Sequence, residues 1–130
     1  VNSKPHGFPK TARVLKRNEY LAIQRSPLRI VTENFIIYGR KKRRRSNRIG
    51  ITVSKKVGNA VVRNLVKRLV RESFRLNHDA LPPELDLVLV ARRQRPVTEL
   101  QTTISQMLEG AQKLGIQFRN RQSKTSKSHA

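Results

Sequence analysis

Apolar residues recur along positions 60–77 with the spacing of an amphipathic helix. At about 100° per residue, one broad arc of such a helix is apolar apart from one serine. The arc contains Val62, Val66, Leu69, Val70 and Ser73. Leu65 lies beside this arc and Phe74 lies near its border. The pattern predicts a helix that packs its apolar side on the rest of the fold.

Other segments show shorter patterns. Asn18 can cap a short helix over NEYLAIQR. Residues 28–40 are rich in β-branched and aromatic residues and predict strands that end near Gly39. Residues 47–54 alternate apolar and small polar positions, as a half-buried strand does, and residues 84–92 predict a more fully buried strand. A capping-box pattern at Thr98 opens a final helix.

The predicted order of elements is α-β-β-β-α-β-α, which indicates an α+β sandwich of one sheet with helices against it. The strands within residues 48–92 can pair in parallel, because a helix connects them. Residues 13–117 are expected to form one domain, preceded by a flexible extension at 1–12 and followed by a disordered basic tail at 118–130. The basic run RKKRRR at 40–45 is predicted to be a solvated, mobile hairpin loop between strands.

The net charge of the chain indicates which class of partner it binds. The chain has 130 residues, with 29 Lys and Arg against 8 Asp and Glu, so its formal net charge is +21. Such a surplus favours polyanionic partners, with nucleic acid ahead of an anionic membrane. Cysteine is absent, which excludes disulfides and thiolate zinc sites. No apolar run has the length of a membrane span or of a signal-peptide core, so we expect a cytoplasmic protein without a membrane partner.

Residues suited to bond-breaking chemistry are scattered. The acids show no metal-binding spacing, and Asp86 is interpreted as a residue at the edge or end of a strand. His6, His78 and His129 have no evident partner for acid–base work. We therefore predict that the chain has no catalytic residue and no metal site of its own.

The polar side of the predicted helix is cationic, with Glu72 as its single acid. A solvated helix face normally mixes charges of both signs, so this one favours contact with nucleic acid. The candidate RNA-binding residues are Lys55, Lys56, Arg63, Asn64, Lys67, Arg68, Arg71 and Arg75. Tyr20, Phe35 and Tyr38 are candidates for stacking on unpaired bases, although each also suits a packed core.

The segment SKKVGNAVVRNLVKRLVRESFR resembles the signature helix of the protein subunit of bacterial ribonuclease P. The resemblance covers about residues 13–115, including LKRNEYLAI, NFIIYG, RIGITVSKK and PPELDLVLVAR. It implies a mixed four-stranded sheet with a left-handed β-α-β crossover, of the kind in domain 2 of ribosomal protein S5. The usual crossover is right-handed.

The resemblance also implies a function. Proteins of this family assist a catalytic RNA that uses Mg²⁺ to remove the 5′ leader of precursor tRNA. The signature helix faces that RNA, and a cleft between the first helix and the sheet binds the single-stranded leader. Tyr20 and Tyr38 match aromatic positions of this cleft. We expect one protein per RNA and no cofactor bound by the protein alone.

Two positions depart from the family pattern. Leu65 stands where a second cation is usual, and Gln24 stands where a second aromatic residue commonly faces the leader. Leu65 is expected either to pack on the sheet or to face RNA. The main alternative function is a small basic ribosomal protein with a structural role on rRNA. A DNA-binding or membrane-active basic protein is a weaker alternative.

Overall fold

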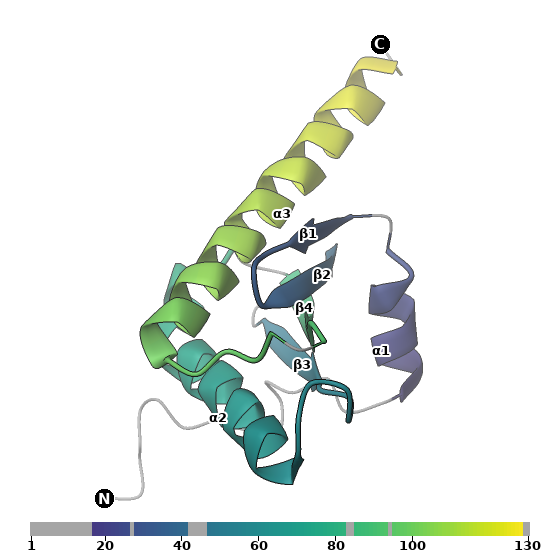
Figure 1. Ribbon diagram of the computed structural model, residues 1–130. Helices are drawn as coiled ribbons and strands as arrows, with labels where there is room; N and C mark the ends of the chain where they lie inside the picture. Colours follow the sequence, from purple (N-terminus) through teal and green to yellow (C-terminus); the bar gives the residue numbers. More distant parts are fainter. Residues whose placement is uncertain (1–16, 27, 42–46, 83–84, 94, 129–130) are drawn as a thin grey trace, which may run out of the picture.

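Figure 1 shows the protein as a computed structural model, which describes residues 17–26, 28–41, 47–82, 85–93 and 95–128, the last eight of these as backbone only. The elements follow the predicted order α-β-β-β-α-β-α, with one additional 3₁₀ turn, η2. They are α1 (Arg17–Gln24), β1 (Arg29–Val31), β2 (Phe35–Lys41), β3 (Arg48–Thr52), α2 (Ala60–Asn77), η2 (His78–Ala80), β4 (Leu85–Ala91) and α3 (Leu100–Ser128). The predicted extension at 1–12 lies outside the described residues.

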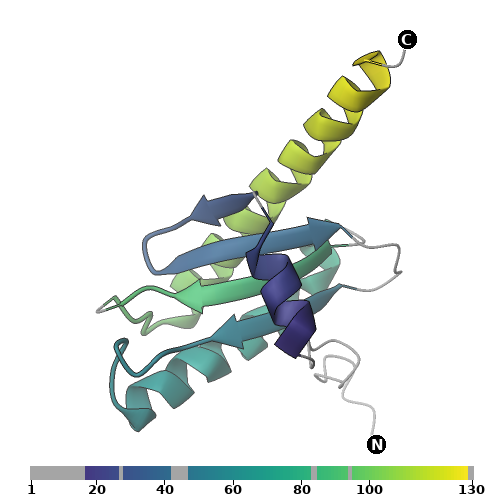
Figure 2. The same ribbon diagram turned by 90° about the vertical axis from the view of Figure 1, so that its right-hand side faces the viewer.

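The four strands form one mixed sheet in the order β1-β2-β4-β3. β2 pairs antiparallel with both β1 and β4, whereas β3 and β4 are parallel. α1 covers one face of the sheet, and α2 and α3 cover the other (Figures 1 and 2). Seen from the α2 side with β3 and β4 pointing upward, β4 lies to the left of β3 (Figure 2). The β3–α2–β4 crossover is therefore left-handed, as the family resemblance implied.

The prediction of a hairpin loop at 40–45 is wrong. β4 is inserted between β2 and β3, so these two consecutive strands are not neighbours in the sheet. Arg40 and Lys41 belong to β2, while residues 42–45 lie outside the described part of the chain. Local pattern could not reveal this, because the strand that separates β2 from β3 comes later in the sequence.

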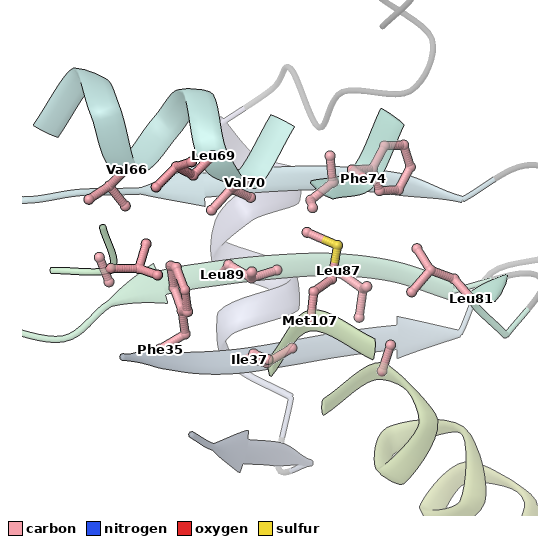
Figure 3. Packing of buried hydrophobic residues seen from close by; sticks show 14 of the residues in the cluster. Phe35, Ile37, Val66, Leu69, Val70, Phe74, Leu81, Leu87, Leu89 and Met107 are labelled. Atoms are coloured by element: carbon pink, nitrogen blue, oxygen red, sulfur yellow. The ribbon is translucent and has the colours of Figure 1, made fainter. Parts of the chain in front are cut away.

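The main core lies between the sheet and the pair α2 and α3. Figure 3 shows side chains of α2 meeting those of β2 and β4, with Met107 of α3 beside them. The fully buried members include Phe35, Ile37, Val66, Val70, Leu87, Leu89 and Met107. α3 approaches β2 closely at Gly110, where an added Cβ would lie 2.3 Å from Ile37 Cδ1. These contacts hold α2 at a fixed height above the sheet.

The end of α3 differs from the expected disordered tail at 118–130. The helix continues to Ser128, and its last turns extend beyond the sheet (Figure 1). Residues 118–128 contain no proline or glycine, and extending an existing helix needs no new nucleus. The low apolar content of this segment therefore did not predict its backbone conformation.

Candidate nucleic-acid interface

The cationic segment forms α2, and its start is capped. The Asn59 side chain accepts a hydrogen bond from the backbone N–H of Val62 at 3.0 Å, which satisfies one of the free donors of the first turn. Before it, Lys55 and Lys56 lie exposed in a turn that Val57 anchors in the core. The cations of this turn therefore precede the cations of α2 along the chain.

The apolar arc of α2 is buried as predicted. Val66, Val70 and Ser73 are fully buried, Leu69 and Phe74 are nearly so, and Val62 is half-buried against the core. The Ser73 hydroxyl donates to the Leu69 carbonyl oxygen at 2.7 Å, so this polar group is satisfied inside the core. Because the arc is fixed, the opposite side of the helix must face outward.

The predicted RNA-binding residues occupy the outward side of α2 and the preceding turn. Lys55, Lys56, Asn64, Arg68 and Arg71 are exposed, while Arg63, Lys67 and Arg75 are half-buried along the flanks. We call this set the α2 face. A rigid row of cations on a helix that is fastened by its other side is suited to a fixed series of phosphates.

Arg75 differs from the other members of the α2 face because its guanidinium is hydrogen-bonded to an acid, Glu72. Its guanidinium donates to both carboxylate oxygens of Glu72, at 3.1 and 2.5 Å. This hydrogen-bonded pair lowers the pKa of Glu72 and raises the pKa of Arg75. Arg75 therefore brings less net charge to the α2 face than Arg68 or Arg71, a difference that the sequence did not reveal.

Two apolar residues frame the α2 face. Leu65 is half-buried and packs against the main core, which decides between the two alternatives for this position. Val61 is 77% exposed in the first turn of the helix, on the outward side. Val61 was not among the predicted site residues, although its angle from the apolar arc indicates that it is exposed.

Tyr20 of α1 and Tyr38 of β2 both lie on the opposite side of the sheet, on the face that α1 covers. They pack with Ile23, Val88 and Val90 in a second, smaller cluster. The backbone N–H of Ile51 donates to the Tyr20 hydroxyl oxygen at 3.2 Å. We call the half-buried pair Tyr20 and Tyr38, with the sheet surface around it, the α1 face.

Gly50 is required for the position of Tyr20. A Cβ added there would lie 2.8 Å from ring atoms of Tyr20, so the ring rests directly on the β3 backbone. Gly50 was not among the predicted site residues. The alternation along residues 47–54 does show that Gly50 shares a face with Thr52, and this face is the one that α1 covers.

The prediction that Phe35 stacks on unpaired bases, as a leader-binding residue would, is wrong. Phe35 is fully buried in the main core, among residues that face α2 and α3. Phe35 and Tyr38 are three residues apart in one strand, so their side chains point to opposite faces of the sheet. Gln24, at the end of α1, is half-buried and offers no aromatic ring beside Tyr20.

A buried ion network fastens α1 to the sheet. Arg48 of β3 donates to Asp86 of β4 at 2.9 Å and to Glu19 of α1 at 2.5 Å. The hydrogen bond to Asp86 raises the pKa of Arg48 further above its already high ordinary value. Asp86 is 1% exposed and is the second residue of β4, so it lies near a strand end as predicted, but β4 is a central strand and not an edge strand. Its role is structural, because both of its oxygens face Arg48.

Neither a metal cluster nor a membrane span is found in the described part of the chain. There, no three His, Asp or Glu side chains come together in a way that could hold a metal ion. The helices described there also lack the combination of length and apolar character that crossing a membrane requires.

The fold and the α2 face define a basic α+β protein of the RNA-binding class. A family model described as Ribonuclease P matches residues 8–114, and the chain therefore belongs to the ribonuclease P protein family. A ribonuclease P protein component from Desulforapulum autotrophicum is 44% identical over 88 residues, which cover 68% of this chain and 75% of the relative.

Solved structures agree with this family membership. The RNase P protein of Staphylococcus aureus superposes with a TM-score of 0.68 at 26% identity, over 80% of this chain and 94% of that one. The RNase P protein of Thermotoga maritima gives a TM-score of 0.66 at 31% identity, over 75% and 92% of the two chains. The predicted fold class is confirmed, and the ribosomal alternative is not favoured.

Proposed function

We propose that this chain is the protein subunit of a bacterial ribonuclease P and assists a catalytic RNA in removing the 5′ leader from precursor tRNA. The observation that carries the proposal is the α2 face, a line of cations on a helix that its buried arc holds rigidly. The family match over residues 8–114 supports the identity of the RNA partner.

In this proposal the α2 face binds the ribonuclease P RNA. Arg63, Lys67, Arg68 and Arg71 contact phosphates, and Asn64 donates or accepts hydrogen bonds between them. Lys55 and Lys56 extend the contact onto the turn before the helix. Each phosphate that is neutralised releases condensed counterions, so the affinity should fall steeply with salt.

The α1 face binds the single-stranded leader. Tyr20 and Tyr38 are half-buried on a surface of β-branched residues, and bases can stack on aromatic rings without regard to sequence. β3 is the edge strand that lies between this face and α2 (Figure 1). One RNA assembly can therefore contact both faces around the β3 edge.

The reaction itself is assigned to the RNA, which uses Mg²⁺. The residues of the α2 and α1 faces hold and orient RNA, and none is given a bond-breaking role. We further propose one protein per RNA and a cytoplasmic location. The protein then raises the local concentration of precursor tRNA on the RNA subunit and lowers the Mg²⁺ needed for activity.

The test is a reconstitution. Purified chain is added to a bacterial ribonuclease P RNA at low Mg²⁺, and removal of the leader from precursor tRNA is measured over time. We expect cleavage that requires the RNA and is strongly stimulated by the chain. RNA-free protein that cleaves by itself would contradict the assignment of catalysis to RNA. Absence of stimulation, together with tight binding to rRNA, would support the ribosomal alternative instead.

A further inference from the structure

A cavity of about 560 Å³ opens beside the middle of α3, away from both faces described above. Its walls come from the end of β2, the segment around η2, the start of β4 and one side of α3. The lining residues are Lys41, Ala80, Leu81, Pro82, Leu85, Gln112, Gly115, Ile116, Phe118 and Arg119. None of these residues belongs to the α2 face or to α1.

The inner part of the cavity is apolar and partly uncovered. Leu81 and Leu85 form buried parts of its wall, while Ile116 is 47% exposed and Phe118 is half-buried. The α3 backbone comes close to Pro82 at Gly115, where an added Cβ would lie 3.0 Å from the ring. Beyond these residues α3 leaves the sheet and extends past it (Figure 1).

The polar lining of the cavity is cationic. Lys41 from β2 and Arg119 from α3 line it, and no acidic residue occurs among the described lining residues. Gln112 adds an amide that can both donate and accept hydrogen bonds. An apolar interior with a phenyl ring, one amide and two cations matches a ligand with a flat ring and an attached anionic group.

We propose that this cavity is a binding site for one unpaired nucleotide of an RNA. Its base enters the apolar part and stacks on Phe118, its edge contacts Gln112, and its phosphate contacts Lys41 and Arg119. The volume is in the usual range of about 300–1,000 Å³ for small-ligand sites. The site is separate from the α1 face, so it holds a different nucleotide from those that Tyr20 and Tyr38 contact.

The inference rests on the proposed function only in naming RNA as the source of the nucleotide. Binding of a free nucleotide can be measured without any ribonuclease P RNA. Failure of that measurement leaves the reconstitution unaffected, and failure of the reconstitution leaves the measurement unaffected.

The experiment is a titration of the full chain, labelled with ¹³C at Leu and Ile methyl groups, followed by NMR. The probes are adenosine 5′-monophosphate, the single-stranded RNA hexamer A₆ and inorganic phosphate. We expect saturable shifts at Leu81, Leu85 and Ile116 with adenosine monophosphate and with A₆. Inorganic phosphate alone should leave these methyl groups almost unchanged, because it cannot fill the apolar part.

Variants separate the contacts. Arg119→Ala should weaken adenosine monophosphate binding about tenfold, as expected for loss of a charge-assisted hydrogen bond. Lys113→Ala is the matched control, because it removes a cation from the same helix outside the cavity and should change the affinity less than twofold. Phe118→Leu keeps an apolar side chain and removes the aromatic face, and it should weaken binding about five- to tenfold.

Four results would overturn the proposal. The first is no shift at the three methyl groups with either adenosine monophosphate or A₆. The second is an equal response to inorganic phosphate. The third is equal weakening by Arg119→Ala and Lys113→Ala, which would indicate charge attraction without a site. The fourth is a set of shifts that follow protein concentration without nucleotide, which would show that a second copy of the chain occupies the cavity.

Discussion

Leu65 lies at the border between the buried arc and the outward side of α2. It is half-buried against the main core, and the exposed Arg68 lies three residues further along the same side of the helix. A long side chain at such a border can keep its stem on apolar surface and extend its charged end into solvent. The position therefore permits a cation even though this chain has leucine.

Leu65→Arg should lower stability slightly and leave RNA binding equal or tighter. Incomplete replacement of the leucine contacts should cost at most ~1–2 kcal/mol of unfolding free energy. The new guanidinium can add one charge-assisted contact to phosphate. Urea denaturation and binding to the ribonuclease P RNA measure the two effects. Leu65→Ala is the control, since it loses the leucine packing and adds no charge. An arginine variant that is unfolded would show that Leu65 is needed in the core.

Glu72→Gln tests whether the ion pair with Glu72 reduces the contribution of Arg75 to RNA affinity. The substitution removes the carboxylate that pairs with Arg75, so RNA affinity at neutral pH should rise and the salt dependence should steepen by up to about one unit. Glu33→Gln is the matched control, because it removes an exposed acid far from α2 in sequence. Equal gains from both variants would mean that only net charge matters.

The same pair predicts a pH dependence of stability. Hydrogen bonding to Arg75 lowers the folded-state pKa of Glu72 below its ordinary value of 4.5. The stabilisation is therefore complete above that value and is lost as the pH falls through the lower folded-state pKa. Unfolding curves of the wild type and Glu72→Gln should differ at neutral pH and converge in acid.

At the scale of elements, α1 packs directly on the backbone of β3, because Gly50 has no side chain to keep the helix away. The Tyr20 ring lies on the Gly50 backbone, and its hydroxyl accepts from Ile51. Gly50→Ala should push the ring away and lower leader affinity about tenfold, as expected for the loss of one stacked base. Binding to the ribonuclease P RNA alone should not change.

Tyr20→Phe is the control for the glycine variant. It removes only the hydrogen bond to Ile51 and keeps the aromatic ring, so leader affinity should fall less than with Gly50→Ala. Leader affinity can be compared by fluorescence anisotropy with a labelled single-stranded RNA. If Gly50→Ala binds the leader as well as the wild type, the α1 face is not the leader site.

The packing of α3 on β2 depends on Gly110. Gly110→Ala brings a Cβ to 2.3 Å from Ile37 Cδ1, so the buried isoleucine must move. Helix propensity gains about 1 kcal/mol, but overpacking costs about 1–3 kcal/mol, and we expect a net loss of stability. Ile37→Val removes the clashing atom, so the double variant should be more stable than the sum of the single changes predicts. Strict additivity in urea denaturation would contradict the close contact.

At the scale of the whole molecule, the net charge is +21, but we expect only the cations of the α2 face to contact the ribonuclease P RNA directly. Lys67→Ala and Arg68→Ala should each weaken binding to the ribonuclease P RNA and reduce the salt slope by about one unit. Arg93→Ala removes an exposed cation from the loop before α3 and should leave the slope unchanged. Filter binding over a range of salt concentrations measures the slopes. Equal slopes for all three variants would mean that the α2 face is not a specific contact.

The order of elements and the RNA-facing side of α2 were predictable from the sequence. Both depend on local periodicity, because a helix turns by a constant angle and its buried arc determines which residues face outward. The burial of Val66 and Val70 and the exposure of Arg68 and Arg71 follow from that angle alone. The family and its fold came from the match of the α2 segment to a known signature.

Tertiary structure decided the features that depend on residues far apart in sequence. The insertion of β4 between β2 and β3 separates strands that local pattern had joined as a hairpin. The same arrangement places the Phe35 side chain in the core and buries Asp86 against Arg48. It also brings Lys41 and Arg119, 78 positions apart, to one cavity. Periodicity shows that a residue has a buried side, but only the assembled sheet determines which element covers it.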